Sequence, residues 1–451
     1  MSKNAVIAGA GLVGSLWAAL LAKRGYQVDV FERRPDPRER GYIGGRSINL
    51  ALSHRGWEAL EKAGARETLE KIAIPMYGRM MHSVAGELTF QAYGTEGQAI
   101  YSVSRGQLNM ELIALADKSD KVRFHFEQSC RRLDVESHSA WVENHATGEA
   151  YWTTCPLLFG ADGAFSAVRN SLMKTPRFNY RQDYLDYAYK ELSIPAGANS
   201  THLIDKNALH IWPRGNFMLI ALPNIDGSFT CTLFLPFEGN ISFEQLHTDD
   251  QIQAFFQHWF PDVVPLIPDL VSDFHQNPTS ALVTVRCSPW NYQDWALLIG
   301  DAAHAIVPFY GQGMNCGFED CSVLDEMMDT YQEDWAAILS VFGQERVKDG
   351  NAIADLALRN FIEMRDLVAD PVFLLRKKIE AHLHEKYPAA FLPVYSMVTF
   401  SSIPYSQAQK ESVEQDALLK AILQLEGIEQ NWPNDPRIDE LFGQWLENKK
   451  A

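Results

Sequence analysis

Three short apolar runs along the chain each end in a glycine-rich turn that leads into a helical pattern. The runs cover residues 4–8, 156–159 and 295–299, and each has the length and composition of a buried strand. A strand, a tight turn and the start of a helix together form a site for a polar, phosphate-bearing ligand. Because the three units lie far apart in the sequence, we expect distant segments to converge on one large ligand.

The first unit is the most complete of the three. Gly9-Ala10-Gly11-Leu12-Val13-Gly14 fits the pattern G-x-G-x-x-G, a helix is predicted over 15–24, and Glu32 follows about 20 positions further on. In this pattern the first glycine makes the turn, the second admits a pyrophosphate, the third lets the helix pack on the strand, and the acidic residue binds ribose hydroxyls. The unit therefore predicts dinucleotide binding. The neighbouring Arg33 and Arg34 leave FAD, NAD and NADP open.

The second and third units each carry an aspartate beside their glycines. They read Gly160-Ala161-Asp162-Gly163 and Gly300-Asp301, and the third continues through Pro308 to Gly313, Met314 and Asn315, where a helical pattern begins. The remaining pattern adds strands over residues 27–31, 77–82, 88–93, 122–126, 131–135 and 141–143, and helices over 53–63 and 106–118. Strands and helices in this order predict a mixed α/β chain.

Alternation with period 2 dominates from about residue 177 to residue 289. It is clearest over 216–223 and 228–236, and a helix is expected over 249–260. The side chains that share a face are Met218, Ile220 and Leu222 in the first strand and Thr230, Thr232 and Phe234 in the second. This pattern predicts a mostly antiparallel sheet with one face covered. Such an inserted domain could cover a cofactor, although core packing alone also explains its apolar residues.

Helical spacing dominates the rest of the chain. Helices are expected over residues 319–330, 335–358, 361–370, 372–384 and 417–425, with Pro371 interrupting the pattern. The sequence shows no internal repeat, low-complexity segment or flexible linker.

Composition narrows the classes of partner. The 451 residues carry a formal net charge of −17, which argues against nucleic acid and against an anionic membrane surface. The six cysteines are scattered without a Cys-x-x-Cys pair, so we expect reduced thiols in a cytosolic protein. The apolar run over residues 5–22 resembles a signal peptide, but its regularly spaced glycines favour a strand–turn–helix. We therefore expect a soluble protein without an anchor.

Two candidate side chains can be explained without a functional role. Arg79 lies in a predicted strand, where a solvated side chain or a surface ion pair is the simplest reading. His304 follows the third turn, and a structural histidine is favoured because a general base must reach the reacting proton.

The three turns together resemble those of the FAD-dependent aromatic hydroxylases, which are single-component flavoprotein monooxygenases. The motifs are GAGLVG, GADGAFSAVR and GDAAHAIVPFYGQGMN, and the resemblance covers roughly residues 5–325. It implies an α/β (α+β) fold with a Rossmann-like, discontinuous FAD-binding domain, an inserted antiparallel β-sheet substrate domain and a C-terminal helical region. The expected ranges are 1–70, 100–176 and 290–370 for the FAD domain, 71–99 and 177–289 for the substrate domain, and 371–451 for the helical region.

A narrower resemblance, to the members of this family that hydroxylate L-kynurenine, is carried by blocks along nearly the whole chain. These blocks are RSINLALS, YGRMMH, ALHIWPRG, PFYGQGMNC, NFIEM and YSMVTF. They imply 3-hydroxylation of L-kynurenine with NADPH and O2, through a C4a-hydroperoxide of non-covalent FAD. No second G-x-G-x-x-G is visible for NADPH, and oligomeric state (monomer or homodimer) stays open. Eukaryotic members end in a membrane anchor, which this chain lacks, so the resemblance implies a soluble, bacterial-type cytoplasmic form.

The resemblance also assigns residues to roles. The cofactor would be bound by Gly9, Gly11, Val13, Gly14, Glu32, Arg33, Ala51, Arg105, Asp162, Asp301, Gly313, Met314 and Asn315. The substrate would be bound by Arg79, Tyr93, Asn360 and Tyr395 at its amino acid end and by Ile220, Leu222, Phe234, Pro308 and Phe309 around its ring. No catalytic acid or base and no metal ligand is implied, since the flavin carries the chemistry.

The sequence leaves two alternative functions open. One is a flavin hydroxylase of another aromatic compound, such as a phenol or a quinolone, which would not need Arg79, Asn360 and Tyr395 together. The other is a non-catalytic dinucleotide-fold protein, such as the prenylation escort proteins, against which the intact GD motif argues.

Overall fold

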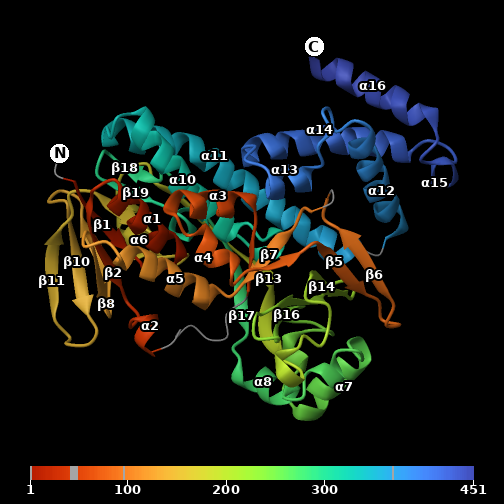
Figure 1. The fold of residues 1–451 in the computed structure, drawn as a ribbon, viewed down its shortest axis with the longest axis horizontal. Coiled ribbons are helices and arrows are strands. Elements are labelled where there is room, and N and C mark those ends of the chain that lie inside the picture. The colour runs from red at the N-terminus through yellow and green to blue at the C-terminus, as the bar shows by residue number, and fades with distance from the viewer. Residues whose placement is uncertain (1–2, 41–48, 95–96, 368–369, 451) are drawn as a thin grey trace.

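The computed structural model describes residues 3–40, 49–94, 97–367 and 370–450. Two large sheets and a group of C-terminal helices make up the molecule (Figure 1). The mixed α/β fold class is therefore confirmed. The first residues of the block RSINLALS, 46–48, lie outside the described residues.

A six-stranded sheet carries all three glycine-rich turns. Its order is β18-β19-β12-β1-β2-β8, and the strands from β19 to β8 are parallel. The strands are β1 (Asn4–Ala8), β2 (Gln27–Glu32), β8 (Val122–Phe126), β12 (Leu158–Gly160), β18 (Asn291–Tyr292) and β19 (Ala296–Leu298). Because β1, β12 and β19 are parallel neighbours, the turns at their carboxyl ends meet at one edge of the sheet. The predicted convergence of the three units is confirmed.

Helix α1 (Leu12–Lys23) packs on this sheet between two other helices. The helices of this half are α2 (Pro37–Arg40), α3 (His54–Ala63), α4 (Arg66–Glu70), α5 (Arg105–Asp117), α6 (Ala167–Leu172), α9 (Asp301–His304), α10 (Gly313–Thr330) and α11 (Trp335–Ile362). Every residue of α1 from Gly14 to Ala22 is buried, as expected for a helix that is rich in Ala and Leu on all sides. A meander of β9 (Gln128–Asp134), β10 (Ser139–Asn144) and β11 (Ala150–Thr154) lies at the edge of this half (Figure 1).

A seven-stranded sheet in the order β17-β13-β16-β15-β14-β5-β6 forms the second half. Its strands are β5 (Gly78–His82), β6 (Leu88–Ala92), β13 (Asn179–Ile194), β14 (Ala208–Pro213), β15 (Met218–Pro223), β16 (Phe229–Pro236) and β17 (Ser280–Ser288). The pairs are antiparallel except β5 with β14.

Both faces of the seven-stranded sheet are covered, whereas the sequence pattern predicted that only one face would be covered. Leu219 and Ala221 pack with α7 (Asp249–Trp259) and α8 (Leu270–Gln276) in one apolar cluster. Met218 and Leu222 lie on the opposite face, in clusters that border the predicted substrate residues. The near-continuous apolar run of β15 reflects this double burial.

A small sheet and five helices complete the chain. The small sheet joins β3 (Leu50–Leu52), β7 (Ile100–Val103) and β4 (Ile74–Met76). The C-terminal helices are α12 (Pro371–Lys386), α13 (Val394–Phe400), α14 (Tyr405–Leu423), α15 (Ile428–Asn431) and α16 (Pro436–Lys450). The predicted break at Pro371 is where α12 begins. The separate helix predicted over 361–370 is wrong, because α11 continues to Ile362 and passes into a π-helical turn at Glu363–Leu367. The predicted domain boundaries stay a prediction.

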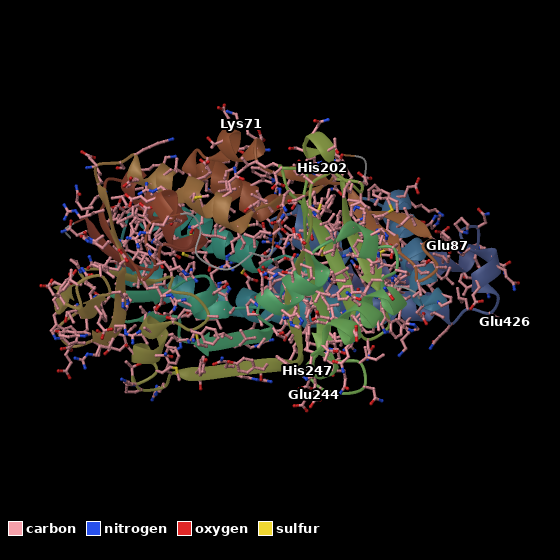
Figure 2. The ribbon with its side chains drawn as sticks, turned by 90° about the horizontal axis from the view of Figure 1, so that it is seen from below. Lys71, Glu87, His202, Glu244, His247 and Glu426 are labelled. Atoms are coloured by element: carbon pink, nitrogen blue, oxygen red, sulfur yellow. The ribbon has the colours of Figure 1, made fainter. Side chains whose placement is uncertain are left out.

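The surface is rich in charged side chains, in keeping with the composition. Lys71, Glu87 and Glu426, for example, are exposed at its periphery (Figure 2). Among the residues that the structure describes, none of the helices combines the length and the hydropathy that a membrane span needs.

Candidate active site

The turn after β1 can be built only with glycine at two positions. Gly9 has a φ of +101°, and a Cβ there would lie 2.5 Å from the carbonyl oxygen of Ala161. A Cβ on Gly14 would lie 2.0 Å from the carbonyl oxygen of Gly9. Gly11, in contrast, has no protein atom within 4 Å of such a position, so its side faces open space at the start of α1. These features fit a pyrophosphate that approaches the backbone at a helix N-terminus.

The three glycine-rich turns touch one another directly. The Gly9 turn packs on Ala161 of the second turn, and Val13 packs against Gly300 of the third turn. The second and third turns are joined by buried Arg169, whose Nη1 donates to the carbonyl oxygen of Ala302 at 2.9 Å. The turns therefore form one continuous binding surface.

A small pocket lies beside the first turn. Its lining is Ala10, Gly11, Glu32, Arg34, Pro35, Pro37, Asn109, Ile113 and Phe126. The Glu32 carboxylate accepts hydrogen bonds from the amides of Ala10 and Arg34, both at 2.9 Å, and is thereby fixed at the pocket wall. Asn109 on α5 donates to the carbonyl oxygen of Ala10 at 3.0 Å. Sequence reasoning missed Asn109, although an asparagine within the apolar pattern of 106–118 was a visible signal.

The two motif aspartates have different surroundings. Asp162 accepts from Ser166 Oγ at 2.5 Å and from the amide of Ala167 at 2.7 Å, so its carboxylate caps α6. Burial raises the pKa of Asp162, while these hydrogen bonds act against the rise. Asp301 is exposed at the first position of α9, directly after Gly300, whose φ is +58°. Of the two, Asp301 is the one whose carboxylate is free to meet a ligand. Arg33 and Arg105 are also exposed, after β2 and at the start of α5.

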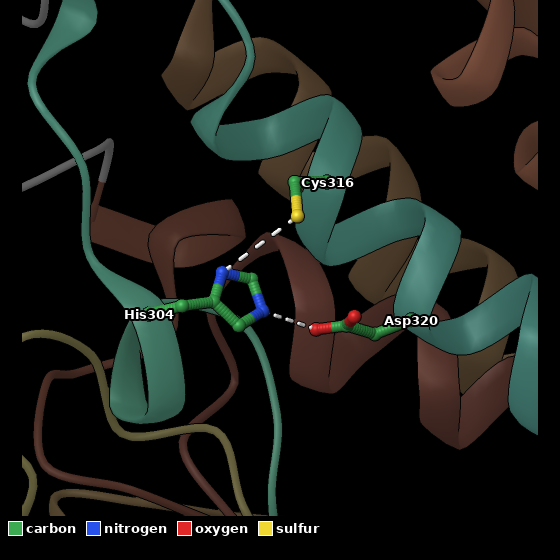
Figure 3. A group of neighbouring side chains, drawn as sticks. All are labelled: His304, Cys316 and Asp320. Atoms are coloured by element: carbon green, nitrogen blue, oxygen red, sulfur yellow. Dashed lines mark hydrogen bonds and ion pairs between the residues drawn. The ribbon is translucent and has the colours of Figure 1, made fainter. Parts of the chain in front are cut away.

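The third turn rests on a buried network of charges. Asp320 of α10 accepts from the amide of Gly300 at 3.0 Å, from His304 Nε2 at 2.6 Å and from Arg346 Nη2 at 3.0 Å. His304 Nδ1 lies 3.8 Å from the Cys316 thiol (Figure 3). Burial acts to lower the pKa of His304, but the Asp320 carboxylate raises that pKa well above its ordinary value.

The roles of this network follow from its geometry. His304, Cys316 and Asp320 bring their polar atoms within 4.8 Å of one another. The Arg346 guanidinium already neutralises Asp320, so the group is satisfied as a hydrogen-bond network rather than arranged for a cation. His304 is only 3% exposed and holds the turn in place, which agrees with its interpretation as a structural histidine.

The loop before α10 is tied to the small sheet by Asn315. Its Oδ1 accepts from the amide of Ser53 at 2.9 Å, and its Nδ2 donates to the carbonyl oxygens of Ala51 and Gly311 at 2.9 and 2.7 Å. Asn315 is fully buried, so the side chain positions this loop, and its backbone at the start of α10 is what remains for a ligand. Gly313 and Met314 begin the same helix, where the helix dipole favours negative charge.

A second group of predicted residues surrounds a half-buried arginine. Arg79 of β5 has its guanidinium carbon 5.1 Å from the ring centre of Tyr395 and 5.5 Å from that of Tyr93. The two tyrosine rings are stacked, with centres 5.5 Å apart, and Tyr310 stacks on the other side of Tyr395 at 5.6 Å. Burial raises the pKa of both Tyr93 and Tyr395, so both phenols stay protonated donors at neutral pH.

Two polar atoms of this group are buried without a partner among the described residues. They are Nε of Arg79 and the hydroxyl of Tyr93. A buried donor without an acceptor is costly, and a guanidinium beside a phenol is suited to an incoming carboxylate. Burial acts to lower the pKa of Arg79, but the neighbouring tyrosines raise it, so the charge is retained.

The apolar residues predicted around the ring lie in two adjoining clusters. Tyr93 and Leu222 share one cluster, Phe234 and Phe309 share the other, and Ile220 packs against both. Pro308 begins the short helix η4 (Pro308–Tyr310) that carries Phe309.

Asn360 of α11 is fixed beside this aromatic group. It donates from Nδ2 to the carbonyl oxygen of Phe309 at 2.7 Å, which leaves its Oδ1 as an acceptor. Phe361, stacked on Phe309 at 4.1 Å, was missed by sequence reasoning because it was placed in a separate helix.

The class of protein follows from these turns and from their similarity to known proteins. A family model described as an FAD binding domain matches residues 3–355. Solved structures share the fold: a 2-methyl-3-hydroxypyridine-5-carboxylic acid oxygenase is 18% identical with a TM-score of 0.67 and covers 82% of this chain and 95% of its own. PqsL of P. aeruginosa, solved with 2-aminobenzoylacetate, is 18% identical with a TM-score of 0.64 and covers 80% and 96%. The protein is an FAD-binding oxidoreductase of the flavoprotein monooxygenase class.

The particular family is shown by closer relatives. Kynurenine 3-monooxygenase of Christiangramia forsetii is 49% identical and covers 95% of this chain and 96% of its own. The enzyme of the same name from Flavobacterium psychrophilum is 49% identical over 99% of both chains, and that of Sus scrofa is 45% identical over 89% and 85%. The chain belongs to the kynurenine 3-monooxygenase family. The family resemblance and the FAD cofactor inferred from the sequence are thereby confirmed.

Replacing Gly9 with alanine is expected to abolish FAD binding. The new Cβ would lie 2.5 Å from the backbone oxygen of Ala161 and would also strain a positive φ, so the first two turns must separate. The measurement is the flavin content of the purified protein, determined from its visible absorbance.

The control for this prediction is Gly25→Ala. Gly25 also has a positive φ, of +86°, but no atom lies within 4 Å of its Cβ position. It should cost about 1 kcal/mol of stability and leave flavin content unchanged. Equal flavin content in both variants would show that the contact between the turns is not needed for binding.

Proposed function

We propose that this protein is a monooxygenase that uses FAD, NADPH and O2 to hydroxylate L-kynurenine to 3-hydroxy-L-kynurenine. The observation that carries the proposal is the buried Nε of Arg79, which has no hydrogen-bond partner among the described residues, beside the hydroxyl of Tyr93, which likewise has none. These donors call for a carboxylate, and the adjoining apolar clusters call for an aromatic ring. L-Kynurenine carries both groups on one small molecule. The names of the close relatives support the same substrate.

The amino acid end of the substrate would be held by three kinds of group. The Arg79 guanidinium would pair with the carboxylate in a bidentate way, with Tyr93 and Tyr395 as further donors. The free Oδ1 of Asn360 would accept from the α-ammonium group. These contacts fix one end of the molecule and so orient the ring at the other end.

The aromatic ring would lie among the apolar side chains of the second sheet and η4. These are Ile220, Leu222, Phe234, Pro308 and Phe309. When bound, FAD supplies the redox chemistry that passes electrons from NADPH to O2 and delivers one oxygen atom to the ring. The apolar walls keep water away from that step, which limits unproductive release of hydrogen peroxide.

No strong general base is needed for this reaction. The amine on the substrate ring already donates electrons to the carbon that is hydroxylated. Tyr310, which is half-buried and stacked on Tyr395, has a pKa that desolvation raises well above its ordinary value, so it cannot serve as a base near neutral pH. His304 is bonded to Asp320 and is likewise not available.

The cofactor would span the three turns. Gly11 and the start of α1 would face the pyrophosphate, Glu32 and Arg33 the adenosine, and Arg105 a phosphate. Asp301 would bind the ribityl hydroxyls, with Ala51 and the backbone of Gly313, Met314 and Asn315 near the flavin ring. Val13 and Asp162 support this surface by packing and capping.

The test is NADPH oxidation by the purified protein with and without L-kynurenine, together with product analysis. A yellow protein whose NADPH oxidation rises with L-kynurenine and that forms 3-hydroxy-L-kynurenine supports the proposal. NADPH oxidation without a hydroxylated product would overturn the assignment of L-kynurenine as the substrate. The substrate would then be another aromatic compound, such as a phenol or quinolone. A colourless protein that does not bind added FAD would overturn the proposal altogether.

A further inference from the structure

The first turn of α3 lies between the cofactor loop and the C-terminal segment that carries Tyr395. On one side, the amide of Ser53, which caps α3, donates to Asn315 Oδ1 at 2.9 Å. On the same side, a Cβ on Gly56 would lie 2.5 Å from that oxygen, so helix and loop are in close contact. The start of α3 is therefore fixed to the first turn of α10.

On its other side the same helical turn binds the C-terminal segment through Arg55. This side chain is fully buried. Its Nε donates to the carbonyl oxygen of Val398 at 3.3 Å, and its Nη2 donates to the carbonyl oxygen of Ile403. The guanidinium lies over the ring of Tyr405 at 4.0 Å and pairs through Nη1 with Glu319 of α10. One side chain thus joins α3, α10 and both ends of the segment 398–405.

Further hydrogen bonds connect the C-terminal segment, the cofactor loop and α3 to one another. Tyr405 donates to Gln312 Oε1 at 2.9 Å, and Gln312 Nε2 donates to Ser53 Oγ at 3.3 Å. Ser402 donates to Glu58 Oε2 at 2.7 Å. The segment after α13 is therefore held against the loop that, in the proposed function, borders the flavin.

Helix α13 has few stabilising interactions within itself. It is seven residues long and has no side-chain cap at its N-terminus, and Ser401, which ends it, is extended. A helix this short is not stable by itself, so its position depends on tertiary contacts. Tyr395 lies one turn before Val398, whose carbonyl oxygen Arg55 binds. A shift of that carbonyl would move the tyrosine that stacks on Tyr93 and borders Arg79.

We infer that Arg55 is a positioning residue that couples the cofactor loop to the substrate site by fixing α13, and with it Tyr395, against Arg79. The inference rests on the proposed function, since it states how the amino acid end of L-kynurenine is held. Arg55 does not touch either ligand. Its guanidinium fork, rather than its charge alone, is what the geometry uses, because two carbonyl oxygens and a carboxylate are bound in different directions.

The variant that tests this is Arg55→Lys, which keeps a positive charge beside Glu319 but cannot reach both carbonyl oxygens. We expect the Kd for L-kynurenine to rise about tenfold, as for the loss of a charged buried hydrogen bond. Flavin content should stay at the wild-type level, and a larger share of the NADPH consumed should yield hydrogen peroxide. Amide hydrogen exchange should rise over residues 394–405 and stay unchanged over α1.

The matched control is Asp416→Asn. Asp416 pairs with Arg359 and Arg376 and so joins α14 to α11 and α12, away from α13. This variant removes C-terminal ion pairs that are more exposed to the solvent than the Arg55–Glu319 pair, and it should leave the Kd for L-kynurenine unchanged. A similar rise in both variants would show a general loosening of the C-terminal helices and overturn the inference.

A double-mutant cycle with Tyr395→Phe decides whether Arg55 acts through Tyr395. Non-additive effects of Arg55→Lys and Tyr395→Phe on the Kd support the inference, and additive effects overturn it. An unchanged Kd in Arg55→Lys, or lost flavin with an unchanged Kd, overturns it as well. If the wild-type protein neither binds nor hydroxylates L-kynurenine, the proposed function is wrong. In that case the amide hydrogen exchange of Arg55→Lys still tests the positioning role of Arg55. A rise confined to residues 394–405 supports this role, and unchanged exchange over these residues overturns it.

Discussion

Replacing Arg79 with alanine is expected to weaken L-kynurenine binding by about 2–4 kcal/mol, which is roughly a 30- to 1000-fold rise in Kd, without loss of FAD. The variant removes the guanidinium that lies beside both Tyr93 and Tyr395. The carboxylate would then be buried without its charged partner, which is the costly case. The measurement is an L-kynurenine titration of the flavin-loaded protein, followed by its visible absorbance.

A ligand comparison sharpens this prediction. The decarboxylated analogue of L-kynurenine should bind the wild-type protein weakly and should bind Arg79→Ala almost as well as L-kynurenine does, because the two ligands differ only in the group that Arg79 recognises. Arg181→Ala, which alters an arginine that is 73% exposed, serves as the control and should bind L-kynurenine normally. Loss of FAD together with unaltered L-kynurenine binding would reject the assignment of Arg79 to the substrate.

Replacing Asp320 with alanine is expected to lower the free energy of unfolding by about 3–5 kcal/mol. The variant leaves His304 buried without its carboxylate partner and takes one carboxylate from Arg346, which keeps Glu319 and Asp349. It also removes the acceptor for the Gly300 amide. A buried charge that loses its partner retains the full cost of its desolvation. The measurement is equilibrium unfolding in urea, with flavin release recorded in parallel because the Gly300 turn rests on this carboxylate.

The control for Asp320 is an aspartate in an exposed ion pair. Asp329 pairs with Arg24, but its side chain is 74% exposed, so Asp329→Ala should lower the free energy of unfolding far less than Asp320→Ala. If the two variants were equally stable, the buried network would not be what supports the third turn.

The local parts of the site could be predicted from the sequence because their signals are local. The turn at Gly9 is dictated by a positive φ and by the close approach of Ala161, and both requirements leave glycines at fixed spacing. Glu32 is found in the same way, since it ends the strand that follows the motif. The convergence of the three turns also followed, because each comes after a strand of one parallel sheet.

The substrate site could not be derived from local pattern. Arg79 looks like a solvated strand residue, but its guanidinium lies against the ring of Tyr395, which comes from α13 far along the chain. Nothing in the alternation of β5 reports that contact, and only the resemblance pointed to it. For Asp162 and Asn315 the motif predicts a ligand-binding role that their side chains do not have. The Asp162 carboxylate caps α6, and the Asn315 amide joins the start of α10 to the small sheet.

The late position of α13 in the chain has a consequence for synthesis on the ribosome. The three glycine-rich turns are complete once α10 has emerged, whereas Tyr395 follows some 65 residues later. At about 5–20 residues per second, the nascent chain would spend roughly 3–13 s with a formed cofactor surface and an open substrate site. FAD could therefore associate with the nascent chain before L-kynurenine has a place to bind. Ribosome-bound chains halted after α10 would be expected to retain flavin, and their aromatic pocket would close only when α13 and α14 are released.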